Sequence, residues 1–259
     1  MKPCSKPFDI SPVFTGRIDC CRCEVSHDEQ KGRTISILVL SKAYEGVRKV
    51  VKTYDRVGNC VEISFTDDND KLVETKLGFA RVQNEFNVYR DLTAKRWYGA
   101  NDALRTNGCA RFEGTYTRTS SGLSVRFNWY DDQGYPATNE QGVAFCRMEY
   151  DREYRLVEME GKNCEKALGS FSDELAKWSV SRDENGRIVS VSAVKADGKS
   201  VFNDIARITL HYEHDDTVVV SAYYEDGRNV EERKVHINEI PWLVEFQKKI
   251  NAMSYKAME

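Results

Sequence analysis

Apolar and polar residues alternate along short segments of the chain, and these segments recur every 30 to 34 residues. The segments begin at Gly46, Gly78, Gly108, Gly142, Glu174 and Asp204. An apolar period of two residues is typical of strands that bury one face. We expect one buried row that faces a single core: Ala80, Val82, Phe86, Ala110, Phe112, Tyr116, Ala144, Cys146, Met148, Tyr150, Ala206, Ile208, Leu210 and Tyr212.

Turn signals follow these strands, and a second strand then runs back. Residues 55–59 and 183–187 combine polar residues with a glycine, as tight hairpin turns do. Residues 44–235 are therefore predicted to form about six tandem antiparallel β-hairpin repeats. The fold class is all-β, a repeat array that curls into a sheet or shell because its apolar face needs cover. Residues 165–175 are the one helical candidate inside the array.

The two ends of the chain depart from this pattern. Residues 1–43 are predicted to form an irregular N-terminal cap with strands near 14–23 and 34–40. Residues 236–259 are predicted to form one C-terminal amphipathic α-helix that begins at Asn238. Its apolar residues recur at spacings of three and four: Ile240, Leu243, Phe246, Ile250 and Met253. The helix is expected to cap the last hairpin, and the alternative is a partner surface with Trp242 and Phe246 as anchors.

Composition narrows the class of protein. The chain has 259 residues, of which 41% are hydrophobic and 31% charged, as in soluble folded proteins. A formal net charge of −3 gives no support for a nucleic-acid partner. No apolar run approaches the roughly 18 residues of a membrane span. The start lacks the apolar core of a signal peptide, and the eight cysteines are scattered, so a cytoplasmic location with reduced thiols is favoured.

Several turns carry a family resemblance. Residues 54–59 (Tyr-Asp-Arg-Val-Gly-Asn), the pair Tyr150-Asp151 and residues 183–187 resemble the tyrosine–aspartate (YD) repeats of bacterial Rhs-type and related surface or toxin-associated proteins. The likeness is closest to a longer bacterial version, it spans about residues 44 to 230, and residues 129–151 match it best; Thr117 and Arg182 depart from it. It implies a non-catalytic β-repeat protein. A second, weaker likeness is to choline-binding cell-wall repeats, whose period is shorter.

Aromatic pairs near the ends of return strands are the candidate ligand-binding residues: Trp97 and Tyr98, Trp129 and Tyr130, and Tyr223 and Tyr224. Adjacent strand residues point to opposite faces, so one member of each pair is expected to be buried and the other more exposed. Exposed aromatic rings aligned along a sheet can bind sugars or a protein. Cross-strand packing is the simpler interpretation.

Metal and catalytic candidates are few. Cys20, Cys23 and His27 form the one metal-like cluster, but no second ligand pair accompanies them, so no metal or cofactor is predicted. His211 and His214 lie beside acidic residues without a marked nucleophile. We therefore predict a non-enzymatic module or scaffold that binds another protein. Glycan or cell-wall binding is the alternative, and an enzyme that uses the His211–His214 region is the third hypothesis.

Overall fold

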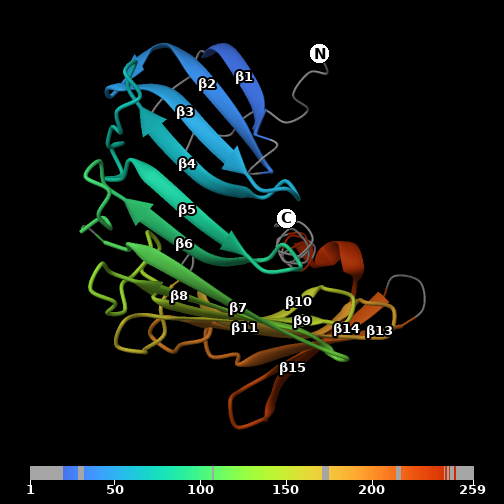
Figure 1. Ribbon diagram of the computed structural model, residues 1–259. Coiled ribbons are helices and arrows are strands. Elements are labelled where there is room, and N and C mark those ends of the chain that lie inside the picture. Colours follow the sequence, from blue (N-terminus) through green and yellow to red (C-terminus); the bar gives the residue numbers. More distant parts are fainter. Residues whose placement is uncertain are drawn as a thin grey trace. The chain divides into compact units, whose positions relative to one another are not determined.

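The structure is a computed structural model, which describes residues 20–28, 32–106, 108–170, 175–213, 217–241, 243, 245 and 248 (Figure 1). Fifteen strands account for most of these residues. They are β1 Cys20–Asp28, β2 Arg33–Tyr44, β3 Val47–Tyr54, β4 Cys60–Thr66, β5 Arg81–Phe86, β6 Leu92–Tyr98, β7 Arg111–Thr119, β8 Gly122–Tyr130, β9 Phe145–Asp151, β10 Leu156–Lys162, β11 Leu175–Arg182, β12 Ile188–Lys195, β13 Arg207–Tyr212, β14 Thr217–Tyr223 and β15 Asn229–His236.

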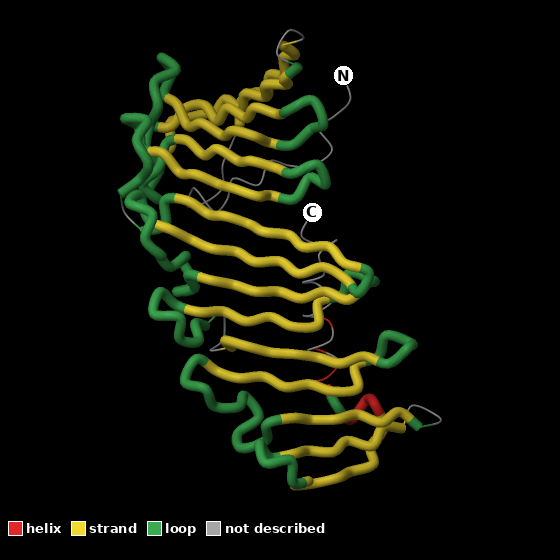
Figure 2. Tube along the Cα trace, turned by 60° about the horizontal axis from the view of Figure 1, so that its bottom comes forward, coloured by secondary structure: helices red, strands yellow, loops and turns green. Residues whose placement is uncertain are grey.

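The strands lie in one sheet in the order in which they occur in the chain, from β1 to β15 (Figure 2). Each described pairing is antiparallel, for example β5 with β6 and β13 with β14. Short connections between sequential strands suit this arrangement, because antiparallel neighbours need only a tight turn. The predicted all-β class and antiparallel hairpins are confirmed.

Two compact units divide the described residues, and each has its own hydrophobic core. Unit 1 comprises Met1–Glu113 and Tyr130–Tyr135, and unit 2 comprises Gly114–Trp129 and Pro136–Glu259. The core of unit 1 is formed by Leu38, Leu40, Val47, Val50, Phe65, Phe79 and Val82. The core of unit 2 draws on β8 to β14 and includes Leu123, Met148, Trp178, Ile188 and Leu210. The expectation of a single core is therefore wrong.

Most of the expected buried row is buried. The buried members are Ala80, Val82, Ala110, Phe112, Ala144, Cys146, Met148, Tyr150, Ile208 and Leu210. Phe86, Tyr116, Ala206 and Tyr212 are half-buried. Phe86 and Tyr212 are the last residues of β5 and β13, where the sheet gives way to turns and cover decreases.

The helix considered for residues 165–175 is wrong for residues 165–170 and Leu175, and residues 171–174 lie outside the described residues. Asn163 Oδ1 accepts the backbone N–H groups of Glu165 and Ala167, each at 3.0 Å, which holds a turn. Leu168 then bridges back to Lys162, and β11 begins at Leu175. An asparagine that hydrogen-bonds to the backbone two and four residues on competes with helix formation.

At the two ends, the structure covers the predictions only in part. The strand expected at 34–40 lies within β2, and β1 overlaps the strand expected at 14–23. After β15 come a 3₁₀ turn, Ile237–Glu239, and helical backbone at Pro241, Leu243, Glu245 and Lys248. No helix can be delimited from these, and the rest of the expected helix lies outside the described residues.

Candidate functional site

Turns of one five-residue geometry join the strands. In the turn that begins at Asp151, its N–H donates to Arg155 O at 3.0 Å, and Tyr154 N–H donates to Asp151 O at 2.9 Å. The fourth residue, Tyr154, has a positive φ. This is a type I turn followed by a left-handed residue, a common hairpin connection. The same bonds close the turns that begin at Asp55, Asp67, Thr75, Asn87, Gly99, Asp131, Asn139, Asn163, Asp183, Lys195 and Tyr224.

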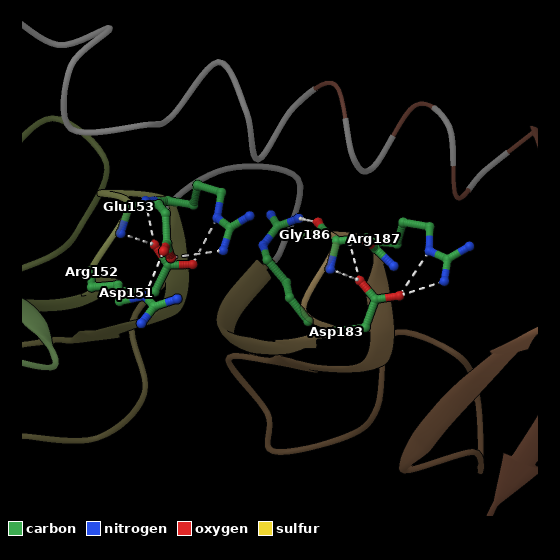
Figure 3. Close-up of polar contacts among 9 residues, drawn as sticks. Asp151, Arg152, Glu153, Asp183, Gly186 and Arg187 are labelled. Atoms are coloured by element: carbon green, nitrogen blue, oxygen red, sulfur yellow. Dashed lines mark hydrogen bonds and ion pairs between the residues drawn. The ribbon is translucent and has the colours of Figure 1, made fainter.

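The first residue of many of these turns also holds the turn with its side chain. Asp183 Oδ1 accepts N–H from Asn185 at 3.0 Å and from Arg187 at 2.8 Å, and Oδ2 accepts from Arg187 Nε at 2.8 Å (Figure 3). Slight burial acts to raise the pKa of Asp183, but the hydrogen bonds and the charge of Arg187 outweigh it, and the pKa lies below its ordinary value. These aspartates are thus engaged within their own turns.

Two adjacent turns of unit 1 carry exposed apolar side chains at their tips. Val57, Val88 and Tyr89 are 63%, 91% and 62% exposed, and we call them the turn-tip cluster. The turns are linked because Arg90 Nε donates to Asn59 Oδ1 at 3.0 Å. The sequence pattern did not predict this cluster, because turn residues are usually polar and solvated. The sequence signal that could have revealed the cluster is the presence of apolar residues between the first residue of a turn, which caps it, and the fourth, which is left-handed.

The aromatic pairs divide between the two faces of the sheet. Trp97 packs against the core of unit 1, and Trp129 packs against the core of unit 2, next to Phe127 at 6.1 Å between ring centroids. Their neighbours Tyr98 and Tyr130 lie under guanidinium groups. These tryptophans are therefore packing residues in the structure rather than part of an open platform.

Arginines cover the tyrosines of these pairs. Arg81 lies 4.3 Å from the centroid of the Tyr98 ring, and Arg111 lies 4.8 Å from that of Tyr130. Tyr223 is covered in the same way by Arg207 at 4.9 Å. Such cation–π contacts occupy ring faces that a sugar would otherwise stack on. Tyr224, the last of the six, is 37% exposed and lies 5.5 Å from Arg228.

Charged side chains on the polar face of unit 2 are paired with one another. Arg147 of β9 contacts Glu158 of β10, and its Nε lies 3.9 Å from Glu160. Lys162 Nζ lies 3.6 Å from Glu160, and Lys177 Nζ lies 3.9 Å from Glu158. These described side chains therefore form a ladder of alternating charge on this face.

The metal-like and catalytic candidates are only partly placed. The side chains of Cys20 and Cys23 lie outside what the structure describes, and His27 Nδ1 lies 2.9 Å from Thr34 Oγ1. Within the described ranges no three His, Cys, Asp or Glu side chains gather as metal ligands. His211 is exposed on β13, whereas His214 is outside the described residues, so the pair cannot be assembled.

The C-terminal anchors proposed for a partner, Trp242 and Phe246, are also outside the described residues. Among their described neighbours, Ile240 and Leu243 are 4% and 1% exposed and belong to the core of unit 2, whereas Pro241 and Glu245 are exposed. Ile240 N–H donates to Ile237 O at 3.2 Å, and Leu243 N–H donates to Ile240 O at 3.1 Å. This part of the segment covers unit 2.

Comparison with protein-family models and with curated proteins found no match for this chain. In the part of the chain that the structure describes, no helix is long and apolar enough to cross a membrane.

Proposed function

We propose that this chain is a non-enzymatic, bacterial-type β-hairpin repeat protein that binds another protein through the turn-tip cluster of unit 1. The observation that carries the proposal is the exposure of Val57, Val88 and Tyr89 on two linked turns. Large apolar side chains gathered at the surface and rimmed by polar residues are typical of protein-interaction sites.

Burial of these side chains supplies a favourable term for binding. A fully buried valine or comparable side chain contributes about 1.5 to 3 kcal/mol relative to exposure. Little ordering cost opposes this gain, because the turn is already held. Asn87 Oδ1 accepts N–H from Tyr89 at 2.9 Å and from Asp91 at 3.0 Å. A surface fixed before binding loses less entropy when the partner docks.

The other hypotheses draw less support from the geometry. Glycan binding by the aromatic pairs needs open ring faces, but Trp97 and Trp129 pack inward and Tyr98 lies under Arg81. Tyr224 is the member that retains an exposed ring. The enzyme hypothesis rests on His211 alone among the described residues, with no assembled site around it.

Affinity capture with the full chain tests the proposal. Val88→Asp combined with Tyr89→Asp should abolish retention of a protein that the unchanged chain captures, because two charges then enter the apolar contact. Tyr135→Asp is the matched control, since Tyr135 is 69% exposed in another turn of unit 1. The proposal fails if the double variant still captures the protein or if Tyr135→Asp loses it equally. Circular dichroism checks that all three proteins fold, and a glycan array tests the alternative.

A further inference from the structure

Arg182 occupies a position that is aromatic in the other segments of the repeat pattern. Eight residues after each segment start come Tyr54, Phe86, Tyr116, Tyr150 and Tyr212, and the corresponding residue of the fifth segment is Arg182. The aromatic residues belong to the apolar side of the sheet, as shown by Tyr150, which is 3% exposed. A charged group at the end of β11 in this row is costly unless it is paired.

The guanidinium of Arg182 is only partly paired. Its Nη1 donates to Gly186 O at 2.9 Å. Its Nε and Nη2 are shielded from solvent and have no hydrogen-bond partner. These two nitrogens lie along the same edge of the guanidinium, and that edge binds a carboxylate or phosphate through two parallel hydrogen bonds. The unused edge is therefore the one suited to an oxyanion.

Neighbouring arginines already use the corresponding edge. Arg187 Nε and Nη2 both lie 2.8 Å from Asp183 Oδ2 (Figure 3). Arg155 Nε donates to Asp151 Oδ2 at 2.8 Å, and its Nη2 donates to Glu153 at 3.0 Å. The two turns thus satisfy their fifth residues, and Asp151 acts on Arg182 through its charge without a hydrogen bond to its free edge.

A second guanidinium converges on the same place. Arg155 Nη1 lies 2.2 Å from the position that a Cβ on Gly186 would occupy, so this arginine approaches the glycine whose carbonyl holds Arg182. The pKa of Arg182 is lowered, first by its burial and then by the charge of Arg155. The negative charge of an anion at this point would offset both effects.

We propose that Arg182, assisted by Arg155, forms an oxyanion-binding site in unit 2. The ligand presents two oxygens of a carboxylate or phosphate group to Nε and Nη2 of Arg182. Because these nitrogens are shielded from water, charge interactions there are screened less than at the open surface. The site is independent of the turn-tip cluster, which belongs to unit 1.

Thermal unfolding and calorimetric titration of the full chain test the site with three probes: inorganic phosphate, acetate and a short glutamate-rich peptide. Each is compared with sodium chloride at the same ionic strength. At least one probe should raise Tm in a concentration-dependent way. A shift in Tm with phosphate identifies a free tetrahedral anion as the ligand, whereas a shift with acetate or the peptide identifies a carboxylate. If no probe shifts Tm beyond sodium chloride, the proposal is overturned.

Substitution at Arg182 separates a binding role from a structural one. Arg182→Tyr restores the aromatic pattern and should raise Tm without ligand while it abolishes the anion-dependent shift. Arg182→Gln keeps a polar side chain and should weaken binding about tenfold or more, as loss of a charged double hydrogen bond predicts. Arg228→Ala, in an exposed turn of the same unit, is the control and should bind as the unchanged chain does. Equal binding by Arg182→Gln would overturn the assignment.

Discussion

Gly122 is the position at which the smallest substitution should do the most damage. It is the first residue of β8, lies opposite Asp151 of β9 and has a φ of +144°. A Cβ built there would lie 1.9 Å from Tyr150 O and 2.8 Å from the carbonyl carbon of Asp151. These are backbone atoms of a core strand, so no side-chain rotation relieves the clash.

The magnitude follows from a comparison with Gly142 in the same unit. Gly142 also has a positive φ, +80°, but a Cβ there meets nothing within 4 Å. Gly142→Ala should therefore cost only the left-handed backbone penalty, about 1 to 2 kcal/mol. Gly122→Ala combines two costs: a backbone conformation that non-glycine residues avoid, and the displacement of β9 from β8. We therefore expect the free energy of unfolding to fall by about 3 to 6 kcal/mol.

Urea denaturation followed by far-UV circular dichroism measures both free energies of unfolding. The denaturant slope should be equal for the two variants, so that the midpoints report stability. Comparable losses for Gly122→Ala and Gly142→Ala would refute the reasoning, because the two sites differ mainly in what the added methyl group meets.

Two further predictions concern the buried row and the free thiols. Phe112→Ala and Ile208→Ala should each lower the free energy of unfolding by about 2 to 5 kcal/mol in the same denaturation assay, since both side chains are buried; losses below about 0.5 kcal/mol at both would contradict the face assignment. Burial raises the pKa of Cys146 to about 12, whereas Cys164 is exposed. A thiol reagent at mildly alkaline pH should therefore label Cys164 in the folded protein and reach Cys146 only after denaturation.

The strands could be predicted because the signal for them is local. On β9, Cys146, Met148 and Tyr150 are buried, and the alternation that reveals this is present in the sequence itself. The division into two cores could not be predicted in this way. It depends on which side chains cover a strand from distant segments, as Ile240 and Leu243 cover unit 2. Period-two patterns carry no information about such long-range cover.

The spacing of the turns explains why the segments found in the sequence recur at an uneven spacing of 30 to 34 residues. One series of turns recurs at intervals of 32 residues, with first residues Asp67, Gly99, Asp131, Asn163 and Lys195. Most of the recurring segments were aligned on glycines, but the left-handed position of these five turns is filled by Gly134 and Gly198 in two of them and by Asp70, Asp102 and Lys166 in the other three. Non-glycine residues in left-handed backbone are uncommon, so composition alone did not identify the equivalent positions.

The turn-tip cluster lies where the turns are free to vary. In the turns that begin with aspartate or asparagine, the first residue caps the backbone and the fourth adopts the left-handed conformation, so the second and third residues contribute little to the turn's geometry. In the turn that begins at Asn87 they are Val88 and Tyr89, whereas in the turn that begins at Asp151 they are Arg152 and Glu153. The same backbone thus presents an apolar tip in unit 1 and a charged tip in unit 2. Because these tips do not determine the fold, their residues can change without loss of stability, and under the proposed protein-binding function such a change would alter the partner.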